Sequence, residues 1–253
     1  MNRQNQPICK GVYLLPNLFT TASLFSGFLG IVWAIEGLFV HCALAILVSC
    51  VLDGLDGMVA RLTRSTSEFG VQLDSLADLV AFGVTPAIMV YMWQLQNYGR
   101  LGLVASFLLV ACGALRLARF NVQSGKVSQK YFIGLPIPAA ACVLATLVLF
   151  STVSPGFLED RFGVLTLTLV YVLSFLMVSR VRYLSLKEFE GMRTHPFRTT
   201  VVAMLMLVVI ASEPKVIGFM FFLTYLISGL VLSFLILPFR KLRLLRESPN
   251  ELP

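Results

Sequence analysis

A membrane hairpin that carries four aspartates is encoded by residues 38–78, which read LFVHCALAILVSCVLDGLDGMVARLTRSTSEFGVQLDSLAD. Leu38–Met58 is almost continuously apolar, and so is Leu73–Trp93 on the far side of a short polar segment, 60–70. A spanning helix needs roughly 20 apolar residues. Because backbone polar groups find no water inside a bilayer, both runs are predicted to be helices. The polar segment is then a tight turn at one membrane surface.

Similar apolar blocks recur along the rest of the 253-residue chain, which is 57% hydrophobic and only 13% charged. Soluble domains carry about 25% charged residues, so most of this surface cannot face water. We therefore expect an all-α polytopic transmembrane helix bundle of about eight spans. The predicted spans are Leu14–Ala34, Leu38–Met58, Leu73–Trp93, Leu101–Leu117, Leu135–Val153, Phe162–Val178, Thr199–Ala211 and Val216–Leu237. The seventh is short for a full crossing.

The distribution of basic residues predicts the orientation of these spans. If the N-terminus lies in the cytoplasm and the spans alternate, only Arg100, Arg161 and Lys215 of the 20 basic residues fall outside. This bias follows the positive-inside rule and places both termini in the cytoplasm. It also accounts for the net charge of +7 without a nucleic-acid partner.

The chain has no long linker or low-complexity tract, so it is predicted to be a single membrane domain, 1–253. Residues 14–140 form its expected catalytic part. Residues 141–253 add further spans and a basic tail. The two longest loops, 116–134 and 179–198, both face the cytoplasm in this topology.

The four aspartates are the acidic residues that lie within or at the ends of apolar spans, where charge is costly and usually functional. Asp53 and Asp56 are three residues apart, and Asp74 and Asp78 are four apart, so each pair shares a helix face. The hairpin lets the two pairs converge. Four carboxylates would repel unless a cation neutralised them, and oxygen ligands favour Mg²⁺ or Mn²⁺. The alternative is that the aspartates pair with nearby arginines and cap helices.

Small residues and an arginine follow the first pair. Gly57 and Ala60 leave a bare helix surface where a nucleotide or diphosphate could approach the backbone. Arg61 can meet phosphate oxygens with its fork of donors. The segment therefore predicts a phosphate-containing substrate beside the carboxylates.

The whole pattern, D-x2-D-G-x2-A-R-x8-G-x3-D-x3-D, runs from Asp53 to Asp78. It resembles the signature of the CDP-alcohol phosphatidyltransferases, and every fixed position matches. Members of that family are polytopic membrane enzymes that move a phosphatidyl group from CDP-diacylglycerol to an alcohol and release CMP. The resemblance implies a homodimer in a bacterial inner membrane, with the active site facing the cytoplasm.

The resemblance also implies residue roles. All four aspartates would bind one or two divalent ions, and Asp78 would act as general base toward the alcohol. Whether Asp78 also contacts metal is open. The residues expected to bind CDP-diacylglycerol are Gly57, Ala60, Arg61, Ser67 and Gly70.

Two further stretches resemble the membrane-embedded bacterial phosphatidylserine synthases within this family, which implies L-serine as the acceptor. They are the extended motif 74–87 and the pair of segments 115–121 and 132–140. We expect Arg116 or Arg119, or both, to hold the serine carboxylate, with Asn121 as an orienting group. The alternative is that both arginines are ordinary positive-inside anchors.

Two other functions stay open at this point. The same chemistry could use another acceptor alcohol, such as glycerol phosphate, inositol phosphate or choline. A cation-coupled transporter would also keep intramembrane carboxylates, although these gather at one face rather than at mid-depth.

Overall fold

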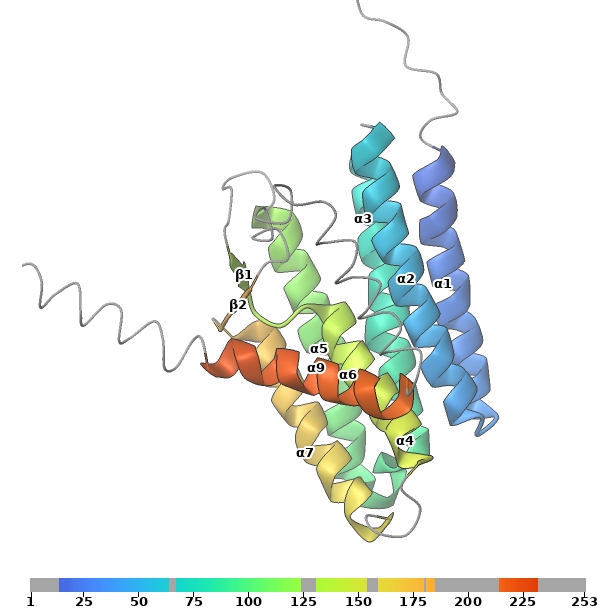
Figure 1. Ribbon diagram of the computed structural model, residues 1–253, viewed down its shortest axis with the longest axis vertical. Coiled ribbons are helices and arrows are strands. Elements are labelled where there is room, and N and C mark those ends of the chain that lie inside the picture. Colours follow the sequence, from blue (N-terminus) through green and yellow to red (C-terminus); the bar gives the residue numbers. More distant parts are fainter. Residues whose placement is uncertain are drawn as a thin grey trace, which may run out of the picture.

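The computed structural model describes residues 14–63, 67–123, 131–153, 159–179, 181–184 and 214–231. The fold begins with an antiparallel pair of helices, residues 14–35 and 39–63. Figure 1 shows the arrangement. The helices of the bundle are α1 (Leu14–Ile35), α2 (Phe39–Thr63), α3 (Glu68–Asp78), α4 (Thr85–Trp93), α5 (Gly99–Gln123), α6 (Ile137–Ser151), α7 (Glu159–Val178) and α9 (Pro214–Val231). A π-helical segment, η2 (Leu79–Val84), joins α3 to α4, and a 3₁₀ turn, η3 (Leu95–Tyr98), precedes α5.

The turn between α1 and α2 is closed by its own backbone. Gly37 has φ +78°, and its N–H bonds to the carbonyl of Ala34 at 3.2 Å. The N–H of Leu38 bonds to the carbonyl of Trp33 at 2.8 Å. These two bonds satisfy the last carbonyls of α1 and reverse the chain, as in a Schellman motif.

Small and hydroxyl side chains on α1 let it pack closely on its neighbours. Ser23 donates to the carbonyl of Ser49 at 3.2 Å, and Ser49 donates back to the carbonyl of Ser23 at 3.0 Å. A Cβ on Gly27 would lie 2.8 Å from the Cα of Ala81 in η2. Such small-residue interfaces are typical of helix packing in membranes, where close approach and interhelical hydrogen bonds replace the hydrophobic driving force.

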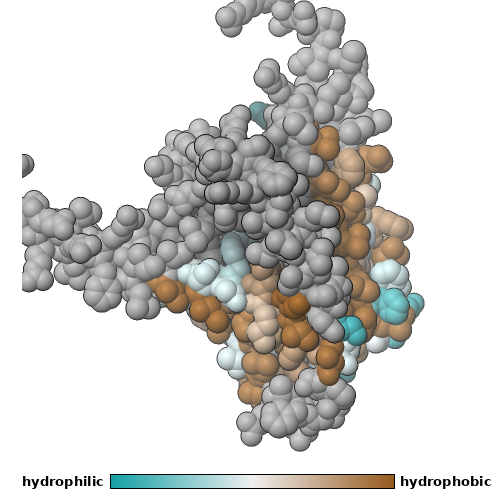
Figure 2. Space-filling view, in the orientation of Figure 1, coloured by the Kyte–Doolittle hydropathy of each residue, from teal (hydrophilic) through white to brown (hydrophobic). Residues whose placement is uncertain are grey.

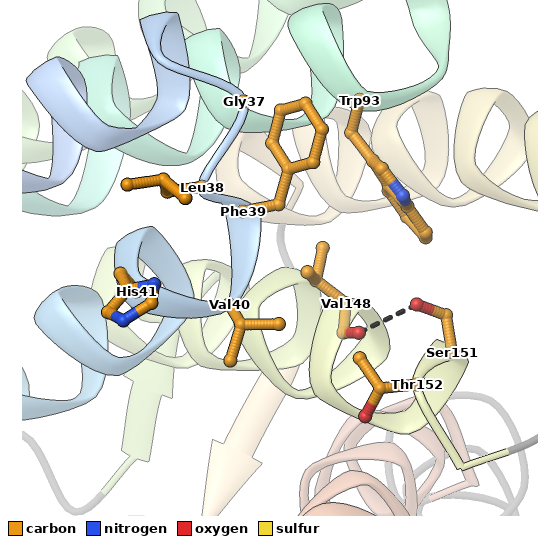
Figure 3. A pocket seen from close by; sticks show the side chains of 9 residues that line it. All are labelled: Gly37, Leu38, Phe39, Val40, His41, Trp93, Val148, Ser151 and Thr152. Atoms are coloured by element: carbon orange, nitrogen blue, oxygen red, sulfur yellow. Dashed lines mark hydrogen bonds between the residues drawn. The ribbon is translucent and has the colours of Figure 1, made fainter.

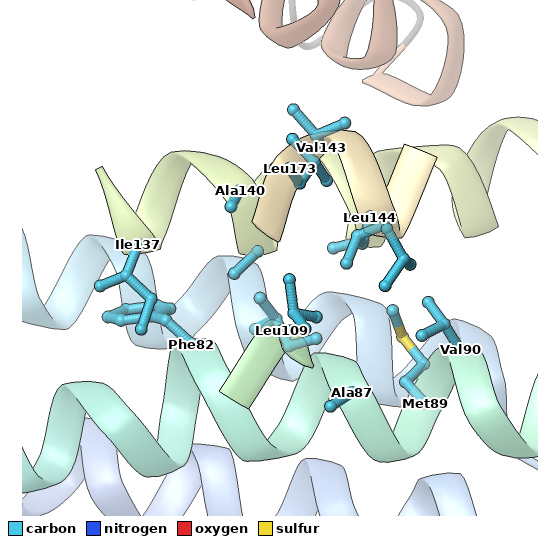
Figure 4. Close-up of a cluster of buried hydrophobic side chains, with 14 of the residues drawn as sticks. Phe82, Ala87, Met89, Val90, Leu109, Ile137, Ala140, Val143, Leu144 and Leu173 are labelled. Carbon is cyan, nitrogen blue, oxygen red and sulfur yellow. The ribbon is translucent and has the colours of Figure 1, made fainter. Parts of the chain in front are cut away.

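The main core lies between α2, α4, α5, α6 and α7, and Figure 4 shows part of it. α6 is buried along almost its whole length, and α9 lies across it (Figure 1). The outer surface is apolar too. Figure 2 shows hydrophobic surface along the side formed by α1 and α2. The exposed large side chains of these two helices include Leu18, Phe25, Phe28, Leu44, Val48 and Val51. Apolar residues that cover the outside as well as the core are typical of a protein surrounded by lipid.

Four helical stretches in the described part are long and apolar enough to cross a membrane. They are Asn17–Ile35, Phe39–Gly57, Glu68–Trp93 and Leu95–Val122. Three shorter apolar stretches match the fifth, sixth and eighth predicted spans: Ile137–Ser151, Phe162–Val178 and Lys215–Gly229. The seventh, Thr199–Ala211, lies outside the described residues. The count of eight and the orientation of the termini stay predictions.

The structure adds one short two-stranded ribbon to the predicted all-α fold. Strands β1 (Tyr131–Ile133) and β2 (Arg182–Leu184) pair antiparallel, with Phe132 opposite Tyr183. The ribbon joins the two long loops that the topology placed on the same side. Next to it, Gly134 has φ +84° and donates its N–H to the carbonyl of Val181 at 2.8 Å. The pairing of β1 with β2 satisfies backbone N–H and C=O groups of these two non-helical segments.

The third span also differs from the single helix expected. It consists of α3, η2 and α4, and α5 extends six residues beyond its predicted end at Leu117, to Gln123. Arg119 and Asn121, which follow the predicted end of this span, therefore lie on the same helix as Arg116. Long basic side chains allow this, because their charged ends can reach the interface while the helix continues.

Candidate active site

Three carboxylates from α2 and α3 lie close together in space. Asp53 comes from α2, and Asp74 and Asp78 from α3; one oxygen of each lies within 4.8 Å of the other two. All three side chains are half-buried. Asp53 and Asp78 lie within hydrogen-bonding distance of each other. The convergence predicted from the hairpin is confirmed for these three residues.

The donor set of this cluster fits a hard divalent cation. Three ionised carboxylates at such separations would repel strongly in a partly buried site. A divalent ion placed between them would neutralise that repulsion, and carboxylate oxygen is the ligand type that such ions prefer.

Asp56 lies at the edge of this cluster and is held from another helix. It is 8% exposed and accepts a hydrogen bond from the hydroxyl of Thr20 on α1. It does not belong to the group of three, but it is close enough to Asp53 and Asp74 to interact with both electrostatically. The four predicted ligands thus divide into three that converge directly and one that is fixed by α1.

The start of α3 is organised around a side-chain cap. Ser67 is the N-cap residue, and its hydroxyl accepts the N–H of Gly70 at 3.0 Å. A Cβ on Gly70 would lie 3.1 Å from the Ser67 hydroxyl and 3.5 Å from Oδ1 of Asn17. Capping of this kind stabilises a helix start. Ser67 and Gly70, predicted to bind substrate, therefore also have a structural role that fixes the α3 backbone leading to Asp74.

The backbone immediately after Asp78 is π-helical. Asp78 precedes η2, and the hydroxyl of Thr85 lies 2.9 Å from the carbonyl of Val80 and 3.0 Å from that of Gly27 on α1. π-Helical segments often mark functional sites, because the extra residue changes the direction of the side chains before it. Here the segment follows directly after the last carboxylate of the cluster.

Helix α5 contributes further polar side chains to this region. Arg116 interacts electrostatically with Asp78 and with Tyr225 of α9. Asn121 donates its amide to the hydroxyl of Ser75 at 2.9 Å, next to Asp74. Arg119 lies one turn beyond Arg116 and is half-buried. Of the three residues expected to bind serine, Arg116 is thus beside the cluster, whereas Asn121 is bonded to α3.

Three further residues of the signature lie in α2, after the aspartates. Gly57 directly follows Asp56 and is half-buried. Ala60 and Arg61 belong to the last turns of α2, and their side chains lie outside the described part. Their predicted contacts with substrate stay predictions.

Several site residues were missed by the sequence reasoning. Asn17 and Thr20 were treated only as parts of an apolar span, yet both approach residues of the signature. The available signal was their spacing, because Asn17, Thr20 and Ser23 recur every three residues in an otherwise apolar helix. Ser75 and Tyr225 had no comparable signal, since only tertiary packing brings them here.

A separate cavity of about 290 Å³ lies at the opposite end of α2. Figure 3 shows its lining, which comes from the α1–α2 turn and the ends of α4 and α6, and includes Phe39, His41, Trp93 and Ser151. Asp53 is 14 residues along α2 from Phe39, about 21 Å at 1.5 Å per residue. The cavity is therefore not part of the carboxylate site.

Comparison with known proteins agrees with this geometry. The family model for CDP-alcohol phosphatidyltransferase matches residues 13–176. A CDP-diacylglycerol–serine O-phosphatidyltransferase of Helicobacter pylori is 40% identical over 220 residues, covering 87% of this chain and 91% of that protein. The enzyme of the same name from Bacillus subtilis is 34% identical over 178 residues, covering 69% and 92%.

An archaeal relative has a related name. An archaetidylserine synthase of Methanothermobacter thermautotrophicus is 36% identical over 172 residues, covering 67% of this chain and 69% of that protein. The family model matches well over half of the residues, and three of the four carboxylates of the signature lie together in space. This chain belongs to the CDP-alcohol phosphatidyltransferase family.

Proposed function

We infer that this protein transfers the phosphatidyl group of CDP-diacylglycerol to L-serine, giving phosphatidylserine and CMP. The observation that carries the inference is the convergence of Asp53, Asp74 and Asp78 within a chain that is 40% identical to an enzyme named for this reaction. In the net reaction the serine hydroxyl oxygen bonds to the phosphorus of the phosphatidyl group. The bond from that phosphorus to the CMP oxygen breaks, and the serine hydroxyl loses its proton.

Asp53, Asp74 and Asp78 would hold a Mg²⁺ or Mn²⁺ ion, with Asp56 as a fourth ligand. The bound ion would neutralise charge on the diphosphate and on the departing CMP. Thr20 supports this arrangement, because it orients the Asp56 carboxylate through a hydrogen bond.

Asp78 is the proposed general base. A serine hydroxyl is a weak nucleophile, and a carboxylate that accepts its proton makes it more reactive. Arg116 lies close to Asp78. In serine the hydroxyl is only a few bonds from the carboxylate, so a carboxylate bound by Arg116 would bring the hydroxyl toward Asp78.

The nucleotide–lipid substrate would lie on the side of α2 and α3 where the signature continues. Gly57 and Ala60 would leave space for it, and Arg61 would bind its phosphates. Ser67 and Gly70 would border it at the start of α3. Arg119 is a second candidate for the serine carboxylate, and Asn121 would act by holding Ser75 and thus α3.

The proposed setting is a bacterial inner membrane, with both termini and the carboxylates on the cytoplasmic side and with two copies forming a homodimer. The distribution of basic residues supports this orientation. The position of the β1–β2 ribbon is consistent with it, because the ribbon joins two loops assigned to that side.

The test is a CMP-release assay on the purified protein with CDP-diacylglycerol, a divalent ion and a panel of acceptors. L-Serine should support release that requires Mg²⁺ or Mn²⁺ and stops when EDTA is added. Glycerol phosphate, inositol phosphate and choline are the comparison acceptors. Faster release with any of them than with serine would refute the assignment of the acceptor.

A further inference from the structure

Helix α4 is fixed in the core by its own side chains, whereas α3 is not. Ala87, Met89 and Val90 of α4 are buried, and Figure 4 shows them among the core side chains. In α3, which the structure describes throughout, Ala77 is the one buried residue, and the neighbouring Leu76 is 64% exposed. The direction in which α3 presents its carboxylates therefore depends strongly on the segment that joins it to α4.

That segment is η2, and it makes a wider turn than an α-helix. The N–H of Thr85 bonds to the carbonyl of Val80, a π-helical bond that spans one residue more than an α-helical bond. An α-helix turns by about 100° per residue, because it has 3.6 residues per turn. If η2 became α-helical while α4 stayed in the core, each residue of α3 would move to the place that its predecessor now holds. Asp74 and Asp78 would then turn away from Asp53.

The side chain of Thr85 joins this wide turn to α1. Its hydroxyl donates to the carbonyl of Val80 at 2.9 Å and to the carbonyl of Gly27 at 3.0 Å. A Cβ on Gly30, one turn along α1, would lie 2.8 Å from Cγ2 of Thr85. Thr85 is fully buried. The two glycines of α1 thus leave the space that the η2 backbone and the threonine side chain occupy.

We propose that Thr85 is a positioning residue for the carboxylate cluster. Its hydroxyl holds η2 in the π-helical form against α1, and that form turns Asp74 and Asp78 toward Asp53. A threonine hydroxyl can do this because it gives the Val80 carbonyl a second donor and ties the same turn to a neighbouring helix. The proposal rests on the proposed function, since it takes these carboxylates as the reactive site.

The first test measures the orientation of α3 without metal or substrate. Ala77→Cys and Leu76→Cys are made singly in a protein whose five native cysteines are changed to alanine, and each is labelled with a lipid-soluble maleimide. Leu76→Cys should react fast and Ala77→Cys slowly, because these positions are 64% and 2% exposed.

Thr85→Val is then added to both proteins, because it keeps the shape of the side chain and removes the donor. If η2 relaxes to an α-helix, residue 77 takes the place that residue 76 held. The labelling rate of Ala77→Cys should therefore rise toward the rate that Leu76→Cys shows with Thr85 intact. An unchanged rate for Ala77→Cys would overturn the proposal.

The second test measures Mn²⁺ binding from the loss of the free-ion EPR signal. Thr85→Val should weaken Mn²⁺ binding about 10- to 100-fold, the usual range when a group that orients metal ligands is lost. Thr85→Ser retains the donor and should bind Mn²⁺ as the wild type does. A serine variant as weak as the valine variant would contradict a role for the hydroxyl.

The matched control is Thr146→Val on α6. Thr146 is also buried, but its hydroxyl donates within its own helix, to the carbonyl of Cys142 at 2.7 Å. This variant should lower the thermal unfolding temperature as Thr85→Val does, yet leave Mn²⁺ binding and the labelling of Ala77→Cys unchanged. Equal loss of Mn²⁺ binding in the two valine variants would overturn the proposal.

The labelling experiment also separates this proposal from the proposed function. A wild-type protein that releases no CMP with serine would refute the assigned reaction. The labelling rates would still decide whether Thr85 sets the orientation of α3, because they need neither substrate nor metal.

Discussion

The hydroxyl of Thr20 donates a hydrogen bond to the carboxylate of Asp56, linking α1 to α2 across 36 positions of sequence. Both side chains are buried, at 4% and 8% exposure. The bond connects a residue outside the family signature to one of its four aspartates. It explains how the carboxylate that does not join the group of three is kept in a fixed orientation.

The first prediction concerns this bond. Thr20→Val keeps the shape of the side chain but removes the donor, so Asp56 loses its fixed orientation. The Mg²⁺ or Mn²⁺ concentration for half-maximal CMP release should rise about 10- to 100-fold, the usual effect of losing a partner that orients a metal ligand.

Two variants serve as controls for Thr20→Val. Thr20→Ser retains a hydroxyl and should restore most of the metal affinity. Thr21→Val alters an exposed threonine whose hydroxyl donates to the Asn17 carbonyl at 2.7 Å within α1. Thr21→Val should behave like the wild type; an equal loss in both valine variants would assign the effect to α1 rather than to Asp56.

The second prediction separates the proposed base from the other carboxylates. Asp78→Asn should lower the maximal rate of CMP release by about 10²- to 10⁴-fold, the contribution typical of a general base. If Asp74 is only a ligand, Asp74→Asn should be partly rescued by a higher divalent-ion concentration, whereas Asp78→Asn should not be.

Glu68→Gln is the control for these two variants. Glu68 is an exposed acid in the first turn of α3, outside the carboxylate group. Its variant should retain the wild-type rate and metal requirement. Rescue of Asp78→Asn by metal alone would show that its role is ligation rather than proton transfer.

The hairpin could be predicted from the sequence because two long apolar runs flank a short polar one, and the bilayer leaves the backbone no alternative to a helix. The spacing within each aspartate pair then determined which faces met. Asp53, Asp74 and Asp78 converge as this reasoning required.

The sequence did not predict the features that depend on long-range packing. The π-helical segment Leu79–Val84 has no distinct hydrophobic period, since its residues are apolar in any helical geometry. The contacts of Thr20 with Asp56 and of Asn121 with Ser75 join separate helices. Only the packing of the bundle decides which polar side chains face each other.

The third prediction concerns Ser75 and Asn121. The Asn121 amide donates to the Ser75 hydroxyl at 2.9 Å, so the pair holds α5 against α3 next to Asp74. Ser75→Ala and Asn121→Ala should each lower activity by a similar factor, about fivefold for a hydrogen bond worth about 1 kcal/mol. The double variant should be no worse than either single one.

This prediction also distinguishes two roles for Asn121. If Asn121 contacts serine directly, Asn121→Ala should raise the KM for serine while Ser75→Ala leaves it unchanged. If Asn121 acts through Ser75, both variants should change the same kinetic parameter. Steady-state kinetics with varied serine decides between them.

The last prediction concerns the contact between α1 and the π-helical segment. A Cβ on Gly27 would lie 2.8 Å from the Cα and 3.0 Å from the Cβ of Ala81, and backbone cannot move aside as a flexible side chain can. Gly27→Ala should therefore push α1 away from η2, at a cost of about 1–3 kcal/mol of stability, as overpacking usually does. Because η2 follows Asp78 directly, activity should fall further than stability alone would explain.

Gly218→Ala on α9 is the matched control, since its Cβ would make an ordinary contact of 3.5 Å with Thr146. Thermal unfolding in detergent, measured together with CMP release, would contradict this account if both variants unfolded at the same temperature.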